Sequence, residues 1–174
     1  MKLTPAIEKF VLHWGEMGGR WGVNRSVAQI HALLYLSGEP MTAEAIAETL
    51  GLARSNVSNS LKELQGWELI QVAHVMGDRR DHFRAKTEIW EMLTVIMDGR
   101  KKREIDPTVA VLATCVDDAH KDRATPKAAE ARMAEMLAFL TELSGWYEKI
   151  KSVPAPTLMK LMKMGARVAK LVGK

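Results

Sequence analysis

Cysteine is almost absent from this chain, because Cys115 is the only one in 174 residues. A single thiol excludes an intrachain disulfide and fits a reducing, intracellular compartment. No stretch approaches the roughly 18 uninterrupted apolar residues of a membrane span. Residues 1–5 also lack the apolar run of a signal peptide. We therefore expect a cytoplasmic protein without a membrane partner.

Charge is nearly balanced, and the sequence signatures of common enzymes are missing. The net charge is +4 and the isoelectric point is about 9.2, which permits nucleic-acid binding without requiring it. We find no nucleophile elbow, zinc signature or phosphate-binding loop. His13, His31 and His82 are scattered without a partnered Ser or Cys. We expect neither an enzyme nor a bound cofactor.

Two clusters that resemble binding sites have simpler interpretations. The glycines at 15, 18, 19 and 22 follow a predicted helix and are not followed by Lys-Ser/Thr, so they predict a flexible connection and not a phosphate loop. Asp117 and His120 share a helical face, but two ligands do not make a metal site. The alternative for this pair is a polar helix end.

The sequence does contain an unusual helix near its centre. Residues 53–64 place Val57, Leu61 and Leu64 on one helical stripe. The start of this helix carries short or forked polar side chains off that stripe, at Arg54, Ser55, Asn56, Ser58 and Asn59. Ser and Asn each cost a few tenths of a kcal/mol, roughly, relative to Ala in a helix. Such side chains are suited to base edges and phosphates, and we interpret this segment as a DNA-recognition helix.

The flanking segments complete a helix-turn-helix with a wing. Thr42 predicts an N-cap with Glu44 in the first turn, and Gly51 predicts a sharp turn after a short helix. Residues 69–75 and 82–85 predict two strands, which the loop 76–81 would join with Arg79 and Arg80 at its tip. Arginine is attracted to phosphates and to narrow minor grooves. Met41 predicts a short third strand.

Taken together, the segment from about Phe10 to about Met97 resembles the winged helix-turn-helix of MarR-type transcriptional regulators, and most of all their GbsR-like branch. The segments that carry the resemblance are 22–26, 30–37, 39–42, 46–47, 51–64 and 77–81. The resemblance implies a mainly α fold with an α/β wing and a long helical C-terminal region. It also implies a homodimer on a pseudo-palindromic operator, with the recognition helix in the major groove and the wing alongside. Relatives usually carry Ser or Thr where Ala53 stands, and an Ala at an N-cap costs about 1 kcal/mol.

With this resemblance, three regions and one DNA-binding surface are predicted. Residues 1–23 form an N-terminal helix at the dimer interface, 24–98 the DNA-binding domain, and 99–174 a helical region for dimerisation or effector binding. Thr4 and Asn24 are the expected caps of the first two helices, and the glycines at 15–22 the connection between them. The candidate double-stranded DNA contacts are Arg25, Thr42, Arg54, Ser55, Asn56, Ser58, Asn59, Lys62, Arg79 and Arg80.

Several features of the C-terminal region leave alternatives open. Asp106-Pro107 predicts a new helix start, and the basic run 100–103 before it fits either a DNA contact or a solvated helix end. A long helix is expected over 126–152. Residues 157–174 form a basic amphipathic pattern, which fits packing on a partner subunit or a membrane surface.

The leading hypothesis is a dimeric, sequence-specific DNA-binding regulator whose affinity a small-molecule effector could shift. A quaternary ammonium effector would need an aromatic cage, for which Trp90, Trp146 and Tyr147 are candidate aromatics after the wing. The alternative hypothesis is a winged-helix module that contacts proteins and binds no specific DNA.

Overall fold

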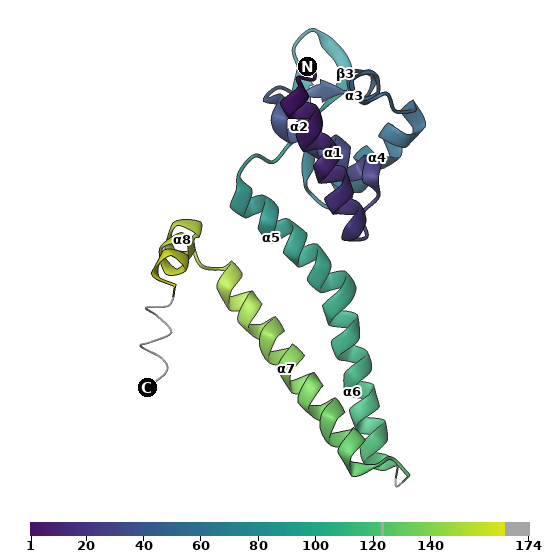
Figure 1. The fold of residues 1–174 in the computed structure, drawn as a ribbon, viewed down its shortest axis with the longest axis vertical. Helices are drawn as coiled ribbons and strands as arrows, with labels where there is room; N and C mark the ends of the chain where they lie inside the picture. The colour runs from purple at the N-terminus through teal and green to yellow at the C-terminus, as the bar shows by residue number, and fades with distance from the viewer. Residues whose placement is uncertain (123, 166–174) are drawn as a thin grey trace. The chain divides into compact units, whose positions relative to one another are not determined.

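The computed structural model describes residues 1–122 and 124–165, and the chain divides into two units at Met97. The first unit is Met1–Ile96 and the second is Met97–Lys174, so the boundary falls inside helix α5 (Ile89–Arg100). Our predicted DNA-binding domain ended nearby, at residue 98. Figure 1 shows the helices and strands of both units.

The first unit is a helix-turn-helix followed by a small antiparallel sheet. Its elements are α1 (Pro5–Arg20), α2 (Arg25–Ser37), β1 (Met41–Thr42), α3 (Ala43–Leu50), α4 (Arg54–Gly66), β2 (Ile70–Val75) and β3 (Asp78–Ala85). The sheet order is β1-β3-β2, and Met41 pairs with Phe83. The predicted short third strand and the mainly α winged-helix fold are therefore confirmed.

Local chemistry sets the starts of three helices, as the sequence predicted. The Thr4 hydroxyl accepts a hydrogen bond from the Ile7 amide at 3.4 Å. The Asn24 side chain accepts from the Ser26 amide at 2.9 Å, and the Thr42 hydroxyl from the Ala45 amide at 3.2 Å. Each bond satisfies one of the amides that a helix start leaves without a partner.

The inner faces of α2, α3 and α4 form one core with the base of the sheet. Its buried members are Val27, Ile30, Leu33, Leu34, Met41, Ile46, Val57, Leu61, Leu64, Leu69, Ile70, Phe83, Ala85 and Met92. The predicted stripe of α4 is buried here in full. This burial fixes the rotation of α4 about its axis, so its polar side faces solvent.

The expected flexible glycine connection is wrong, because α1 continues as a helix to Arg20. Gly15 and Gly18 are buried where α1 packs on α2. A Cβ added at Gly18 would lie 2.5 Å from the Ala28 Cβ, and one at Gly15 would lie 2.6 Å from the Gln29 side chain. These glycines therefore allow the two helices to approach closely. Only Gly22, with φ +77°, lies in the connection.

The predicted wing is a hairpin, but its loop is shorter than expected. Strand β3 begins at Asp78, which pairs with Val75, so only Met76 and Gly77 form the turn. Gly77 has φ +84°, a conformation that glycine adopts without strain. The placement of Arg79 and Arg80 at a loop tip was wrong. Both belong to the strand, because the tight turn lets pairing extend into the polar residues.

The second unit begins with a helix that does not stop where proline predicted a new start. The rest of α5 continues through a π-helical turn, η1 (Lys101–Ile105), into α6 (Asp106–Lys121). Asp106 has helical backbone angles and caps nothing; its carboxylate accepts from Lys101 at 2.7 Å. Proline lacks the amide that an interior α-helical bond requires, and a π-turn is one way to accommodate it. The predicted bounds agree with α5, which ends at Arg100, and with α6, which begins at Asp106. The expected cap at Asp106 was wrong, because η1 joins the two helices without a break.

Helices α6 and α7 (Lys127–Lys151) pack against each other, and α8 (Ala155–Met164) follows. Polar bonds join α7 to the C-terminal end of α5: the Tyr147 hydroxyl donates to Asp98 at 3.0 Å, and Lys151 donates to the same carboxylate at 3.1 Å. The long predicted helix over 126–152 is confirmed to within a residue at each end. The part of the predicted basic amphipathic pattern over residues 166–174 lies outside the described residues.

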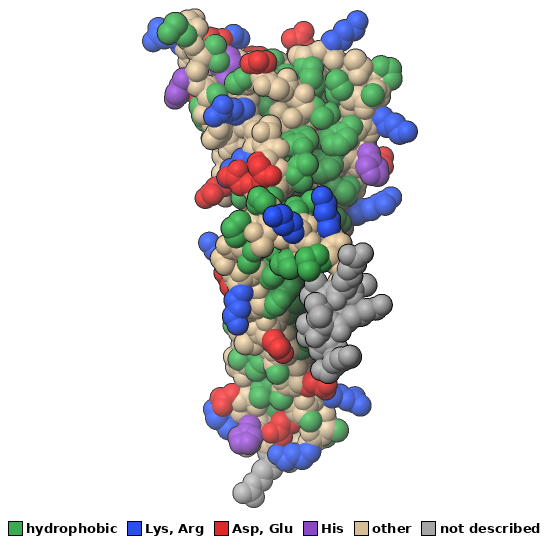
Figure 2. All heavy atoms as spheres, turned by 90° about the vertical axis from the view of Figure 1, so that its left-hand side faces the viewer, with side chains coloured by type: hydrophobic (Ala, Val, Ile, Leu, Met, Phe, Trp, Pro, Cys, Tyr) green, Lys and Arg blue, Asp and Glu red, His purple; other side chains and the backbone are tan. Residues whose placement is uncertain are grey.

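Much of the apolar surface of the second unit remains exposed. One face of α7 carries four exposed large side chains, Met136, Phe139, Leu143 and Trp146. Apolar side chains appear along the helical region in the lower half of Figure 2. Among the described residues, no helix combines the length and the apolarity needed to cross a membrane.

Candidate nucleic-acid interface

The outer face of α4 presents polar side chains to solvent. Arg54, Ser55, Ser58, Asn59 and Lys62 are all exposed, whereas the alternating apolar positions of the helix are buried. All five are among our predicted DNA contacts. They form a continuous polar surface on the first two and a half turns of the helix, and such a surface can reach base edges in a major groove. That they bind DNA stays a prediction.

Asn56 differs from its neighbours because its side-chain amide already makes hydrogen bonds within the protein. The side chain is half-buried; its nitrogen donates to the Ser26 hydroxyl at 2.9 Å, and its oxygen accepts from the Ser60 hydroxyl at 3.3 Å. These bonds tie the start of α4 to the start of α2, thirty residues earlier. A base contact by Asn56 would have to share or replace them.

The start of α4 lies where the sequence predicted it, and it lacks a side-chain cap. Ala53 stands at the N-cap with φ −60° and ψ 138°, and no side chain accepts a hydrogen bond from the first turn. The predicted register of the polar residues is therefore correct. The first turn of α4 also contains no acidic residue.

An ion pair that the sequence did not predict joins α3 to α4. The Arg54 guanidinium contacts the Glu44 carboxylate at the start of α3. A hydrogen bond from its own backbone amide, followed by the Arg54 charge, lowers the pKa of Glu44. Glu44 thus remains ionised beside an arginine that we predicted to contact DNA. The only sequence signal was an acid in the first turn of α3, which we attributed to the helix dipole.

The wing contributes two arginines in different environments. Arg80 is held by Asp78 through its Nε at 2.9 Å and through its backbone amide at 3.0 Å. These bonds from Arg80 hold the pKa of Asp78 well below its usual range. Asp78 therefore fixes the position of the Arg80 side chain. Arg79 is exposed, and alternation along β3 directs it to the opposite face from Arg80.

The two remaining predicted contacts lie at the starts of other helices. Thr42 is buried, and its hydroxyl caps α3. This burial argues for a structural role and against a direct phosphate contact. Arg25 is exposed at the first position of α2, next to the serine that bonds Asn56. The starts of α2, α3 and α4 are therefore linked by side-chain contacts within one surface.

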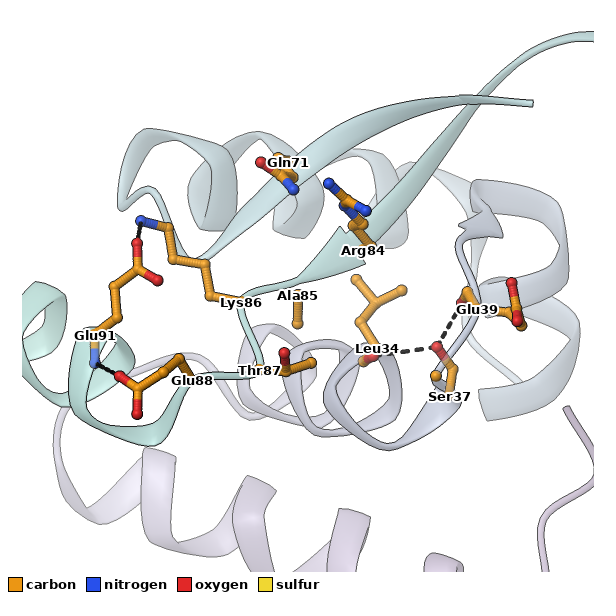
Figure 3. Close-up of a pocket in the computed structure, with 11 residues that line it drawn as sticks. Leu34, Ser37, Glu39, Gln71, Arg84, Ala85, Lys86, Thr87, Glu88 and Glu91 are labelled. Atoms are coloured by element: carbon orange, nitrogen blue, oxygen red, sulfur yellow. Dashed lines mark hydrogen bonds and ion pairs between the residues drawn. The ribbon is translucent and has the colours of Figure 1, made fainter. Parts of the chain in front are cut away.

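The first unit also has a pocket of about 470 Å³, lined by the end of α2, strands β2 and β3, and the start of α5 (Figure 3). Its polar groups mostly bond one another. Lys86 contacts Glu91 at 2.6 Å, and Glu88 accepts from the Glu91 amide at 2.7 Å. No aromatic side chain is among its described lining residues. It is therefore not the aromatic cage that a quaternary ammonium effector requires.

The residues weighed as metal ligands pair with other side chains. Asp117 contacts Lys121, and His120 contacts Glu130 at 3.1 Å. Within the described ranges, no group of three or more His, Cys, Asp or Glu side chains is arranged to hold a metal ion.

The first unit is similar to known proteins. Residues 21–81 match the model of the MarR family. Over 102 residues the chain is 24% identical to the HTH-type transcriptional repressor GbsR of Bacillus subtilis (strain 168), an alignment that covers 59% of this chain and 54% of that protein. The chain thus spans about half the length of this curated relative.

A solved structure described as the crystal structure of a transcriptional regulator has a similar fold. Its TM-score is 0.64 at 18% identity, and the match covers 84% of this chain and 96% of that one. The family match runs from the residue before Gly22 into β3 and so includes α2, the helix-turn-helix and most of the wing. The winged helix-turn-helix fold is therefore confirmed. The matches to the MarR family model and to GbsR agree with the predicted resemblance to MarR-type regulators of the GbsR-like branch.

Proposed function

We propose that this chain is a sequence-specific DNA-binding transcriptional regulator that acts as a homodimer in the cytoplasm. The observation that carries the proposal is the exposed polar face of α4 within a MarR-family domain. The relatives are described as transcriptional regulators, one of them as a repressor, and not as enzymes. This supports a regulator over an enzyme.

Two layers of contact would produce binding. Lys62 and Arg79 are exposed cations that can neutralise phosphates, which gives salt-dependent affinity without sequence preference. Arg54, Ser58 and Asn59 can bond base edges, and a good bidentate contact discriminates by about 1–3 kcal/mol. A two-fold dimer would place two recognition helices on half-sites about 34–36 Å apart, so the operator would be pseudo-palindromic.

The second unit supports the homodimer. Of its described residues, only Ala119 and Leu158 are buried apolar side chains. A helical pair with so little core of its own needs a further surface to cover its apolar face. The exposed side chains at 136, 139, 143 and 146 recur at three- and four-residue steps, which is the pattern of a helix–helix contact. The N-terminal helix is expected to join this interface.

Dimerisation through this face can be tested with paired α7 variants. Phe139→Glu places a charge on the exposed apolar stripe and should weaken self-association in sedimentation velocity. Ala138→Glu adds the same charge at the adjacent exposed position, off the stripe, and should leave association unchanged. If the two variants self-associate equally in sedimentation velocity, the proposed interface is refuted.

An effector could act through the same helices. In a dimer, the helices that follow the wing would set the spacing of the two α4 helices. A small molecule that binds one spacing of the α4 helices more tightly than another would favour that spacing. The affinity of the dimer for DNA would then change by the same factor at most. The chemistry of the pocket in Figure 3 does not identify such a molecule.

The experiment is selection from random duplexes, followed by measurement of affinity against salt for the enriched sequence. Wild type should enrich a palindrome with a steep salt dependence. Arg79→Ala should make the salt slope shallower by about 0.9, the loss of one phosphate contact. Lys9→Ala, which removes an exposed cation from α1, should not. Binding without an enriched sequence would favour the protein-contact module instead.

A further inference from the structure

The start of α4 combines three features that are each unfavourable for a helix. Ala53 provides no cap, the first turn has no acidic residue, and the first helical residue is the cation Arg54. The partial positive charge of a helix N-terminus favours anions and disfavours cations. Local sequence alone would therefore leave this end frayed and the arginine without a defined position.

A carboxylate from another helix stands at this point. Glu44 of α3 contacts the Arg54 guanidinium at a surface where the two side chains are 39% and 66% exposed. Asp78 raises the pKa of Arg80 most, and the charge of Glu44 raises it further. Glu44 therefore also lies near the wing. The negative charge of Glu44 thus lies among side chains that we propose for contact with a polyanion. A residue that served affinity alone would not be acidic there.

We propose that Glu44 is a specificity-determining residue, which positions Arg54 for a guanine base and disfavours its use on phosphates. The inference rests on the proposed function. Arginine has five N–H donors, so it can contact Glu44 and a second acceptor together. The O6 and N7 atoms of guanine are neutral acceptors and can approach beside the carboxylate. A phosphate that contacts Arg54 is negatively charged, and the nearby Glu44 carboxylate repels it.

The size of the effect follows from the repulsion of two exposed charges. At about 4 Å in a water-like medium, this repulsion corresponds to about fivefold in affinity. Glu44→Gln keeps the shape of the side chain and an acceptor oxygen but removes the charge. The variant should bind random duplexes about fivefold more tightly, with a salt slope steeper by about 0.9 because Arg54 becomes one more phosphate contact.

The test measures the dissociation constants of the full chain for the selected operator and for random duplexes. Wild type, Glu44→Gln and Glu48→Gln are compared over a salt series. Glu48 is exposed on the same helix, one turn later, and makes no ion pair in the part of the chain that the structure describes. We expect the operator-to-random affinity ratio to fall about fivefold in Glu44→Gln only. Urea midpoints of the variants verify that folding is unchanged.

A double-mutant cycle tests whether Glu44 acts through Arg54. With Arg54→Ala present, adding Glu44→Gln should leave the ratio unchanged, because the residue that Glu44 positions is gone. The inference is overturned if Glu44→Gln leaves the ratio of a selective wild type unchanged, if Glu48→Gln lowers it equally, or if the change persists without Arg54. A wild type that enriches no sequence overturns the proposed function itself, and this inference with it.

Discussion

The absence of a side-chain N-cap on α4 allows a quantitative prediction. At Ala53 the backbone already has the extended angles of an N-cap, φ −60° and ψ 138°. In this chain, threonine at the equivalent position of α3 accepts a bond from the third helical amide at 3.2 Å. Ala53→Thr should form the same bond with the Asn56 amide. An N-cap is worth about 1 kcal/mol, which is about fivefold in the folding equilibrium constant.

Urea unfolding followed by tryptophan fluorescence measures this gain. Four of the five tryptophans lie in residues 1–96, so the signal reports mainly the first unit. Ala53→Val is the matched control, because valine has the shape of threonine without the hydroxyl. The threonine variant should exceed the valine variant by about 1 kcal/mol at an unchanged slope. If both variants unfold at the same urea concentration, the helix start does not need this bond and the reasoning is refuted.

Three further variants test the packing and the polar contacts. Gly18→Ala should destabilise the fold by roughly 1–3 kcal/mol through the clash with α2, whereas Gly19→Ala, whose added Cβ meets nothing within 4 Å, should not; equal urea midpoints would contradict this. Burial lowers the pKa of His31 from 6.5 to about 4, so stability should be complete above pH 6.5 and fall by roughly 3 kcal/mol as the pH drops to about 4. His31→Leu should remove that dependence from urea midpoints taken at pH 7 and pH 5, and an unchanged difference between them would count against it. Tyr147→Phe removes the bond to Asp98 and should lower the thermal stability of the second unit by about 1 kcal/mol, while an equal loss in Trp146→Phe would point to packing instead.

The sequence predicted the features that depend on nearby residues. The caps at Thr4, Asn24 and Thr42, and the start of α4 after Ala53, each follow from chemistry within a few positions. The buried stripe of α4 follows from helical periodicity. The winged-helix fold could be predicted because these signals occur in a fixed order along the chain.

The errors arose where distant packing determined the local structure. The glycines at 15 and 18 indicate a break when α1 is considered alone, but α2 lies against them and uses their missing Cβ atoms. Polar residues after Gly77 indicate a loop, but pairing with β2 carries them into a strand. Asp106-Pro107 indicates a capped helix start; α6 does begin at Asp106, but the π-turn before it keeps the backbone helical, so Asp106 is not a cap.

In the candidate site too, features set by nearby residues were predicted and features set by distant packing were not. Sequence reasoning selected its exposed polar residues, because their types are unfavourable for an ordinary helix. It did not predict that Arg54 contacts Glu44, or that Asn56 bonds Ser26. Both partners come from other helices, and only the packed core brings them to the start of α4.

The stability of α4 explains why these residue types are tolerated. Burying Val57, Leu61 and Leu64 contributes about 1.5–3 kcal/mol for each side chain. The absent cap costs about 1 kcal/mol, and each exposed Ser or Asn costs a few tenths. Burial therefore exceeds the combined local penalties even at the lower values. Because the inner face alone holds the helix in place, the residues on its outer face can be selected for what they contact, including an arginine at a position where the helix dipole opposes it.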